Sequence, residues 1–472
     1  MSLVAHLQDI LGLDNVLTGD DTLPYLTDWR GRFTGKALAV VRPGTVEEVA
    51  DVVKLCQQFD TPMVTQGGNT GLCGGATPSN KGDAVVIVMT RLNKVIDIDT
   101  ENDTITVEAG CVLQTIQEQA EKAGRLFPLS LASEGSCTIG GNLATNAGGT
   151  QVLRYGNARD LTLGLQVVTA EGEIWNGLRG LRKDNTGYDL RNLFIGSEGT
   201  LGIITAATLK LYPLPVAQVT ALLAFADIAT GVAILNRAKF GFGASLTGFE
   251  LISSHCMENV RRGLPDLNMP FEANKASWYA LIEISDAESE AHARALFEKV
   301  IEQSFEAGEL LDAVIAESQQ QSQALWNIRE SIPLVSAKLG QEIKHDISVP
   351  ISKIAEFVEV TNAQLQELLP GVKHAVFGHL GDGNLHYNVG APDAQEEGFL
   401  DNQKDVYKVV FDSVAAFGGS ISAEHGIGQL KKDLLLDYKD EVELALMRKI
   451  KRALDPHALL NPGKVISSVE RY

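Results

Sequence analysis

The chain has 472 residues, more than one hydrophobic core usually organises, so two or three domains are expected. Its hydrophobic fraction of 44% and charged fraction of 21% are those of a globular protein, which excludes a disordered, coiled-coil or fibrous chain. With 60 acidic and 40 basic residues the net charge is -20, and this field repels phosphate backbones and anionic lipid, so nucleic acid is not an expected partner.

Targeting signals and cysteine chemistry give two further expectations. No apolar run reaches the about 20 residues that a membrane span requires, and the N-terminal region lacks the basic start of a secretory signal. A cytoplasmic protein without a membrane span is therefore expected. The 5 cysteines are scattered and form no CxxC pair, so we expect them to be reduced and structural.

Helical and strand-like segments alternate in the first part of the chain. Periodic apolar residues predict helices over 46–59 and 113–123. Runs rich in β-branched residues predict strands over 84–88, 104–108 and 165–169. This mixture predicts an α+β fold.

A second pattern of elements follows in the middle of the chain. A predicted strand over 278–283 precedes a long amphipathic helix over 288–307 and another helix over 318–340. Prolines 213 and 215 flank the end of a predicted strand over 207–211, so a domain change is expected there. After residue 441 the chain is again helical.

These segments suggest three parts, with expected boundaries 1–215, 216–425 and 426–472.

The first glycine-rich segment, Gly67 to Gly75, follows a short predicted strand over 62–65. Clustered glycines let backbone N–H groups turn around a phosphate without obstruction by Cβ atoms. Neither GxGxxG nor GxxxxGK is present, so neither the Rossmann nor the P-loop solution is encoded. Taken alone, the loop is equally compatible with a turn that binds nothing.

Two more segments of this kind, 135–149 and 196–204, occur in the same region. The first combines glycines with small hydrogen-bonding residues, and the second leads directly into a predicted strand. Three such segments in one α+β region are hard to explain as independent turns, so together they favour a bound nucleotide.

These three segments, with residues 43–50, 182–190 and 460–462, resemble the FAD domain of the vanillyl-alcohol oxidase/PCMH-type flavoproteins. The similarity is closest to the branch of D-2-hydroxyglutarate and D-lactate dehydrogenases. It implies a two-subdomain FAD-binding domain over 1–215 and an α+β cap domain over the isoalloxazine, 216–425, for the substrate and the metal. The C-terminal helical segment, 426–472, is expected to return to the FAD domain.

The resemblance assigns FAD contacts to residues of the glycine segments and to one C-terminal asparagine. The assigned residues are Gln66, Gly67, Gly68, Asn69, Thr70, Gly71, Leu72, Gly75, Gly135, Ser136, Ile139, Gly140, Gly141, Asn142, Thr145, Asn146, Gly148, Gly149, Glu198, Gly199, Ile203 and Asn461. Some relatives link the flavin covalently through a histidine in the first loop. Asn69 stands there in this chain, so we expect FAD to be bound without a covalent link.

Four of the 9 histidines fall in one short stretch, and one of them follows a glutamate directly: His374, His379, His386 and Glu424-His425. Imidazole nitrogens and a carboxylate oxygen suit a divalent ion such as Zn²⁺, and three protein ligands leave a position open for substrate. The alternative is that these are structural histidines held by hydrogen bonds.

The resemblance implies roles for these residues. His379, His386 and Glu424 match the metal ligands of the family, and His425 matches a residue at the reacting carbon; His374 has no counterpart. Arg329, although surface charge is the simpler reading of it, matches a substrate-binding residue, as do Lys344 and Asn388. Pro333 departs from the family, because some members have a threonine there whose hydroxyl contacts the substrate.

The expected function is FAD-dependent, metal-assisted oxidation of a D-2-hydroxy acid, with D-2-hydroxyglutarate favoured because Arg329 and Lys344 are available for a second carboxylate. A D-lactate or D-malate-like dehydrogenase is the alternative within enzymes, and a non-catalytic FAD-binding subunit of a respiratory complex is the alternative of another class. The electrons are expected to pass to a separate acceptor such as an electron-transferring flavoprotein or a quinone. The sequence leaves open which acid reacts, which acceptor and metal are used, the reactivity with oxygen, and whether the chain forms a homodimer.

Overall fold

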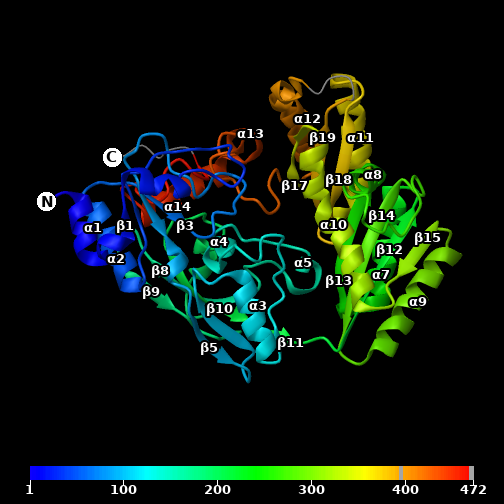
Figure 1. Cartoon of the computed structure of the whole chain (residues 1–472), viewed down its shortest axis with the longest axis horizontal. Coiled ribbons are helices and arrows are strands. Elements are labelled where there is room, and N and C mark those ends of the chain that lie inside the picture. Colours follow the sequence, from blue (N-terminus) through cyan, green and yellow to red (C-terminus); the bar gives the residue numbers. More distant parts are fainter. Residues whose placement is uncertain (393–396, 467–472) are drawn as a thin grey trace. The chain divides into compact units, whose positions relative to one another are not determined.

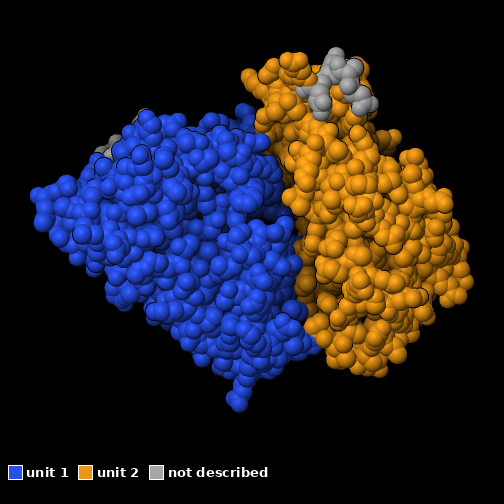
Figure 2. Space-filling view, in the orientation of Figure 1, with its two compact units in different colours: residues 1–149, 156–214, 424–472 blue, residues 150–155, 215–423 orange. Residues whose placement is uncertain are grey.

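The computed structural model describes residues 1–392 and 397–466, and the chain divides into two compact units, coloured separately in Figure 2. Unit 1 contains residues 1–149, 156–214 and 424–472, and unit 2 contains residues 150–155 and 215–423.

The units differ from the expected domains at two places. Helix α5 (Val152–Tyr155) belongs to unit 2, because it packs on strand β13 of that unit and Arg154 donates a hydrogen bond of 2.8 Å to the carbonyl of Ser285. Residues Glu424 and His425 belong to unit 1 rather than to the cap. The Glu424 carboxylate accepts a hydrogen bond of 3.0 Å from the backbone N–H of Gly149 in the same unit.

Unit 1 contains two main sheets and a short strand pair. The smaller sheet has the strand order β1-β2-β4-β3, in which β2, β4 and β3 are parallel, and the larger sheet is antiparallel with the order β5-β6-β10-β8-β9. The strands are β1 (Val16–Leu17), β2 (Ala39–Val41), β3 (Met63–Gln66), β4 (Val85–Val88), β5 (Val95–Asp99), β6 (Thr104–Glu108), β7 (Arg125–Leu126), β8 (Thr162–Val168), β9 (Ile174–Gly177), β10 (Ile203–Lys210) and β11 (Tyr212–Pro213).

Helix α2 (Val46–Gln58) illustrates how the sequence forms the helices of this unit. The Thr45 side chain accepts a hydrogen bond from the Glu48 backbone N–H and so caps the first turn. The apolar residues of α2 recur at helical spacing and are buried against α1 (Leu3–Leu11) and the smaller sheet. The other helices of unit 1 are α3 (Leu113–Lys122), α4 (Ile139–Ala144), α6 (Arg191–Phe194), α13 (Leu435–Tyr438) and α14 (Glu441–Leu454).

Unit 2 is built on one sheet of eight strands in the order β15-β12-β14-β13-β18-β19-β16, with β17 also paired to β19 (Figure 1). The strands are β12 (Ala217–Phe225), β13 (Leu246–Ser253), β14 (Trp278–Asp286), β15 (Asp312–Ile315), β16 (Glu342–Ile343), β17 (Asp346–Ser348), β18 (Lys373–His379) and β19 (Asn384–Gly390). The remaining helices of unit 2 are α7 (Ile228–Phe242), α8 (Ser254–Gly263), α9 (Glu290–Glu306), α10 (Gln319–Leu339), α11 (Ile354–Leu368) and α12 (Gln403–Ala416).

Alternation of side chains along the strands gives this sheet two different faces. On one face Ile252, Leu281 and Phe377 form an apolar core with α8 and α10, which also pack on each other. On the opposite face His345 lies edge-on to the aromatic ring of Tyr387 and to rings from α12. The first face is called the α8/α10 face below.

The predicted α+β class is confirmed, and the long predicted helices and strands each correspond to an observed element. Among the helices that the structure describes, none combines the length and the apolar composition needed to cross a membrane.

Candidate active site

The three glycine segments of unit 1 line one cavity, together with His425. Of the residues assigned to FAD, those in its lining are Gly67, Gly68, Asn69, Thr70, Gly71, Gly75, Gly140, Gly141, Asn142, Thr145, Glu198, Gly199 and Ile203. The lining also includes Thr65, Cys73, Ala76, Met89, Ala109, Thr138, Ala144, Gly202 and Ile204, which the sequence analysis did not select. Most of these additional lining residues are adjacent in sequence to residues assigned to FAD, so their nearness to the glycine-rich segments could have identified them.

The glycines allow the first two segments to approach each other closely. A Cβ atom on Gly68 would lie 2.0 Å from the carbonyl oxygen of Ser136, and one on Gly67 would lie 2.2 Å from the hydroxyl oxygen of Thr138. Neither distance is sterically allowed, so a larger residue would force the loop after β3 away from the segment before α4. The glycines thus shape the cavity by bringing these loops together.

The other residues assigned to FAD lie outside the cavity lining: Gln66, Leu72, Gly135, Ser136, Ile139, Asn146, Gly148, Gly149 and Asn461. Two of them have clear structural roles. Gln66 donates hydrogen bonds to the carbonyls of Tyr25 and Ala76 at 3.0 and 3.1 Å. Asn461 donates to the carbonyls of Gly75 and Glu198, at 2.9 and 2.7 Å, and so holds the first and third glycine segments together.

Glu198 connects the third glycine segment to the turn that carries His425. Its carboxylate accepts hydrogen bonds from the backbone N–H groups of Ile427 and Gly428, both at 2.7 Å. Burial raises the pKa of Glu198, although these two hydrogen bonds act to lower it. The glutamate therefore fixes the chain just after His425 at the edge of the cavity.

The polar groups in the cavity fit a nucleotide cofactor. The Thr138 hydroxyl is buried and has no hydrogen-bond partner within the described part of the chain, so it is available to a ligand. Asn69 adopts a left-handed backbone conformation with φ of 52° and its side chain donates to the Thr27 carbonyl at 2.9 Å. An amide in this position cannot form the covalent flavin link that a histidine could.

In unit 2, the predicted metal ligand His379 is oriented by a buried carboxylate. His379 ends β18 and lies opposite Glu250 of β13. Its Nδ1 is 2.5 Å from Glu250 Oε1, and both side chains are buried. A donor N–H at Nδ1 leaves the lone pair of Nε2 for a metal, which is the arrangement that metal-binding histidines generally adopt.

The same glutamate also binds Arg329 of α10. The Arg329 Nε donates to Glu250 Oε2 at 2.8 Å, and its guanidinium lies 4.9 Å from the centre of the Phe377 ring. Burial alone would raise the pKa of Glu250, but the charges of His379 and Arg329 and their hydrogen bonds lower it to about 2. Glu250 is therefore an anion, and Arg329 is its buried counter-ion rather than a surface charge.

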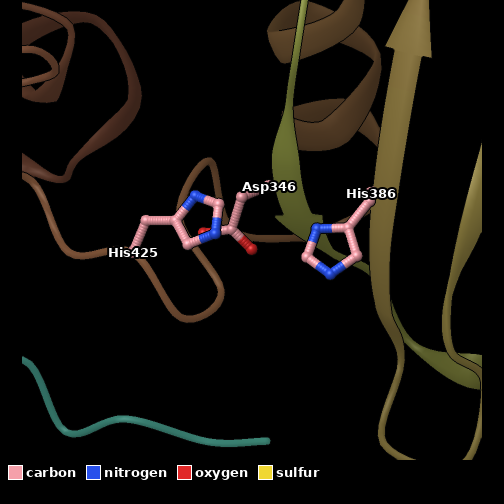
Figure 3. A group of neighbouring side chains, drawn as sticks. All are labelled: Asp346, His386 and His425. Atoms are coloured by element: carbon pink, nitrogen blue, oxygen red, sulfur yellow. The ribbon is translucent and has the colours of Figure 1, made fainter. Parts of the chain in front are cut away.

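The second predicted ligand, His386 of β19, lies beside Asp346 on the neighbouring strand β17. The two residues are direct partners in the pairing of β17 with β19, and Figure 3 shows the His386 ring extending to the side where the Asp346 carboxylate lies. A ring nitrogen of His386 lies within 4.8 Å of an Asp346 oxygen and also within 4.8 Å of a ring nitrogen of His379. Asp346 also accepts a hydrogen bond of 3.1 Å from Asn384.

The predicted substrate residues Lys344 and Asn388 share one carboxylate, that of Glu342. The Lys344 Nζ is 3.8 Å from Glu342 Oε2, and the Asn388 amide donates to the same oxygen at 3.3 Å. Burial raises the pKa of Glu342, although the charge of Lys344, the Ser336 hydroxyl and the Asn388 amide lower it. Arg329 and Lys344 therefore each have a carboxylate partner, and their assignment to a second carboxylate of the substrate stays a prediction.

The α8/α10 face thus gathers five of the predicted site residues: Arg329, Lys344, His379, His386 and Asn388. The other two, Glu424 and His425, belong to unit 1. Three further carboxylates lie on this face, Glu250, Glu342 and Asp346, and the sequence does not reveal them because their importance depends on which strands pair. His374 lies on the opposite face, because it is adjacent in β18 to Ala375, which pairs with Asn388 of the α8/α10 face. Pro333 lies within α10 and is exposed.

The family description "FAD binding domain" matches residues 37–177, and "FAD linked oxidases, C-terminal domain" matches residues 214–465. Proteins named D-2-hydroxyglutarate dehydrogenase are similar over nearly the whole chain. The protein from Xanthomonas citri pv. viticola is 41% identical over 94% of this chain and 92% of its own length. That from Stutzerimonas stutzeri is 36% identical over 99% of both, and the mitochondrial protein of Bos taurus is 37% identical over 98% of this chain and 84% of its own length.

Solved structures share the fold at low sequence identity. A crystal structure of p-cresol methylhydroxylase with substrate bound matches 98% of this chain and 96% of its own, with a TM-score of 0.75 and 18% identity. A structure of alkyldihydroxyacetonephosphate synthase matches 98% of this chain and 84% of its own, with a TM-score of 0.72 and 18% identity. The predicted PCMH-type fold is therefore confirmed.

Proposed function

Because the chain belongs to the FAD-linked oxidases, and within them to the family of D-2-hydroxyglutarate dehydrogenases, we propose that it oxidises D-2-hydroxyglutarate to 2-oxoglutarate. Its class, an FAD-dependent dehydrogenase, follows from the two family matches and the full-length relatives. The substrate, the metal, the acceptor and the residue roles below are parts of the proposal.

The observation that carries the proposal is that His425 lines the same cavity as the three glycine segments. When bound there, FAD supplies the two-electron oxidant that takes a hydride from the carbon bearing the hydroxyl group. His425 accepts the hydroxyl proton, so the substrate loses one hydride and one proton and becomes the 2-oxo acid. Glu198 supports this role, because its hydrogen bonds fix the backbone two and three residues beyond His425.

We further propose that His379, His386 and Glu424 hold Zn²⁺ or a similar divalent ion. Such an ion, when bound, polarises the substrate's hydroxyl oxygen and makes its proton more acidic. The support for two of the ligands is local: Glu250 orients His379, and the nitrogens of His379 and His386 lie within 4.8 Å of each other. Glu424 is included because it matches the family pattern.

The function is tested by mixing the purified flavoprotein, without oxygen, with D- and L-2-hydroxy acids and following the flavin absorbance. Bleaching by D-2-hydroxyglutarate and not by its L-enantiomer is the expected result. Absence of bleaching with every D-2-hydroxy acid would reject the proposed reaction. Repeating the reaction with an electron-transferring flavoprotein or a quinone then identifies the acceptor.

The metal is tested by chelation and by substitution. Treatment with a chelator is expected to remove the ion and stop turnover while FAD stays bound, and His379→Ala or His386→Ala to lose the ion in elemental analysis. Glu250→Gln, which keeps the size of the side chain but not its charge, is expected to weaken metal binding by about 10- to 100-fold. Full activity after verified metal removal would reject this part of the proposal.

D-lactate is the second candidate substrate, and one observation favours it. Both cations assigned to a second carboxylate are already paired, Arg329 with Glu250 and Lys344 with Glu342. A short acid with a single carboxylate would leave both ion pairs intact. The ratio of kcat/KM for D-2-hydroxyglutarate and D-lactate decides between the two.

A further inference from the structure

Glu342 is an unusual neighbour for a site that is to receive an anion. It lies in the two-residue edge strand β16, opposite Gly390 of β19, and a Cβ atom on that glycine would come within 4.0 Å of its Cγ. Its side chain is 7% exposed, and one of its oxygens contacts both Lys344 and Asn388. The Glu342 carboxylate therefore contacts the same cation and amide donor that the family resemblance assigns to the substrate.

Two carboxylates that shared these donors would repel each other strongly. A second carboxylate bound by Lys344 and Asn388 would lie within a few ångströms of the Glu342 oxygens. At the effective dielectric of a protein site, two anions so close repel by an amount that lowers affinity about tenfold or more. Either the substrate's tail carboxylate or that of Glu342 has to be neutral for both to share these donors.

The surroundings decide which of the two is neutral. Burial is the largest influence on Glu342 and favours its uncharged form, so protonation there is less costly than for a carboxylate in water. The tail carboxylate of a substrate arrives from solvent with its ordinary acidity.

Several charged or polar groups surround Glu342. Lys344 follows it in the chain, Asn388 comes from β19 and Ser336 from α10. The cavity that Glu342 lines is also bordered by His255 and Arg262 of α8 and by Lys373 of β18. Burial nevertheless has a larger effect on its pKa than the charge of Lys344 does.

We propose that Glu342 determines substrate specificity by taking up a proton when a dicarboxylate binds, and by repelling the tail carboxylate when it stays ionised. This inference rests on the proposed function, because it takes Lys344 and Asn388, which match substrate-binding residues of the family, to hold the tail carboxylate of D-2-hydroxyglutarate. An acid without a tail carboxylate, such as D-lactate, needs no such proton. The preference of the enzyme for dicarboxylates over monocarboxylates therefore falls as the pH rises through the pKa of Glu342.

The direct test is calorimetry on the wild-type holoenzyme. 2-Oxoglutarate, the product of the proposed reaction, has the same tail and does not reduce the flavin; pyruvate is its counterpart without the tail carboxylate. Binding heats measured in buffers of different ionisation enthalpy give the number of protons taken up. Above the pKa of Glu342 we expect the uptake with 2-oxoglutarate to approach one proton more than with pyruvate. Equal uptake for both ligands would overturn the inference, and this experiment needs no variant.

Glu342→Gln gives the second test. It is expected to abolish the extra proton uptake and to lower the KM for D-2-hydroxyglutarate at alkaline pH by about tenfold, while the KM for D-lactate changes by less than about twofold. Glu283→Gln is the matched control, since Glu283 is also a buried carboxylate of this sheet with a raised pKa, but is bonded to Trp326 and Thr220. Unchanged uptake in Glu342→Gln, or its loss in both variants, would contradict a role for Glu342.

The two proposals can fail separately. If no D-2-hydroxy acid bleaches the flavin, the proposed reaction is rejected whatever the calorimetry shows. If D-2-hydroxyglutarate is oxidised but its dicarboxylate product binds without extra proton uptake, only the role of Glu342 is rejected.

Discussion

The ion pair between Arg329 and Glu250 is the most deeply buried charge pair on the α8/α10 face for which contacts are described, with side chains 8% and 0% exposed. Glu250 contacts both Arg329 and His379, so Arg329→Ala would leave the buried carboxylate with His379 alone of these two partners. We expect a loss of about 3 to 5 kcal/mol in the free energy of unfolding, measured by urea denaturation.

The matched control for this change is Arg294→Ala, which removes an arginine from the exposed ion pair with Glu290 of α9. That change should cost less than about 1 kcal/mol. If Arg329→Ala unfolds like the wild type and loses only activity toward D-2-hydroxyglutarate, then Arg329 acts on the substrate and is not needed as a counter-ion.

His374 gives a pH prediction. Burial, with a smaller effect from His255, lowers its pKa from 6.5 to about 4 in the folded chain. The unfolded chain therefore binds the proton first as the pH falls, so the contribution of a neutral His374 is complete above pH 6.5 and is lost progressively toward pH 4. Because water still reaches part of the ring, we expect this loss to be roughly 2 kcal/mol.

The measurement is the free energy of unfolding over this pH range for wild type and His374→Phe, which cannot titrate. The wild type should lose more stability on acidification than the variant does. Replacement of the exposed His457 by Phe is the control. Parallel pH profiles for wild type and His374→Phe would show that His374 titrates normally in the folded chain.

At the residue scale the sequence predicted the donors of the site but not their partners. His379 and His386 are visible because they flank a glycine-rich turn, and the glycines are visible because they cluster. Glu250 lies more than a hundred positions before His379, and only the pairing of β13 with β18 brings the two together. The same applies to Asp346 and His386, whose contact depends on the register of β17 and β19.

At the element scale, the loop after β3 and the segment before α4 depend on glycine. In Gly68→Ala the new methyl group would meet the carbonyl oxygen of Ser136 at 2.0 Å. We expect the two segments to separate, with a loss of about 1 to 3 kcal/mol in the stability of the FAD-free protein and with weaker FAD binding. Thermal unfolding measures the first effect, and the flavin absorbance of the purified protein measures the second.

Gly71→Ala is the matched control in the same loop, since a Cβ atom there would meet nothing within 4 Å. The FAD-free form of this variant should be as stable as the wild type. Equal loss of stability in both variants would mean that loop flexibility, and not the contact at Ser136, sets the requirement for glycine.

Elements with a long and regular pattern could be predicted from the sequence, and short ones could not. The predicted helix over 46–59 is observed as α2 (Val46–Gln58), and that over 318–340 as α10 (Gln319–Leu339). The strands β16 and β17 have two and three residues, too few for a period to be recognised, yet they carry Glu342 and Asp346.

At the scale of the whole molecule, the cysteines of both units are protected by burial. All five lie in the described part of the chain, are buried and form no disulfide there, and burial raises the pKa of Cys56 and Cys256 to about 12 and that of Cys111 to about 11. Thiolates are the reactive form, so we expect slow reaction with a disulfide reagent in the folded protein and rapid reaction of all five after unfolding. Rapid modification of Cys56 or Cys256 under native conditions, located by mass spectrometry, would contradict this.

Length predicted two or three domains, and the chain divides into two compact units, but the path of the chain between the units could not be predicted. Residues 150–155 belong to unit 2, although the glycine-rich segments on either side of them belong to unit 1. Nothing in the composition of this short segment indicates the change. It follows from the packing of α5 on β13, a contact between positions far apart in the sequence.

Unit 1 consists of three separate segments of the chain, and this determines the order in which the two units are completed during translation. A ribosome releases the chain from its N-terminus, and unit 2 has all its residues once position 423 has emerged. At that moment the flavin cavity still lacks His425, and the bridge between Met63 and Leu460 beside β3 cannot form. Asn461, which joins two of the glycine segments, is made later still. Unit 2 can therefore fold during translation before unit 1 has all of its residues, and capture of FAD follows only after Asn461 has emerged.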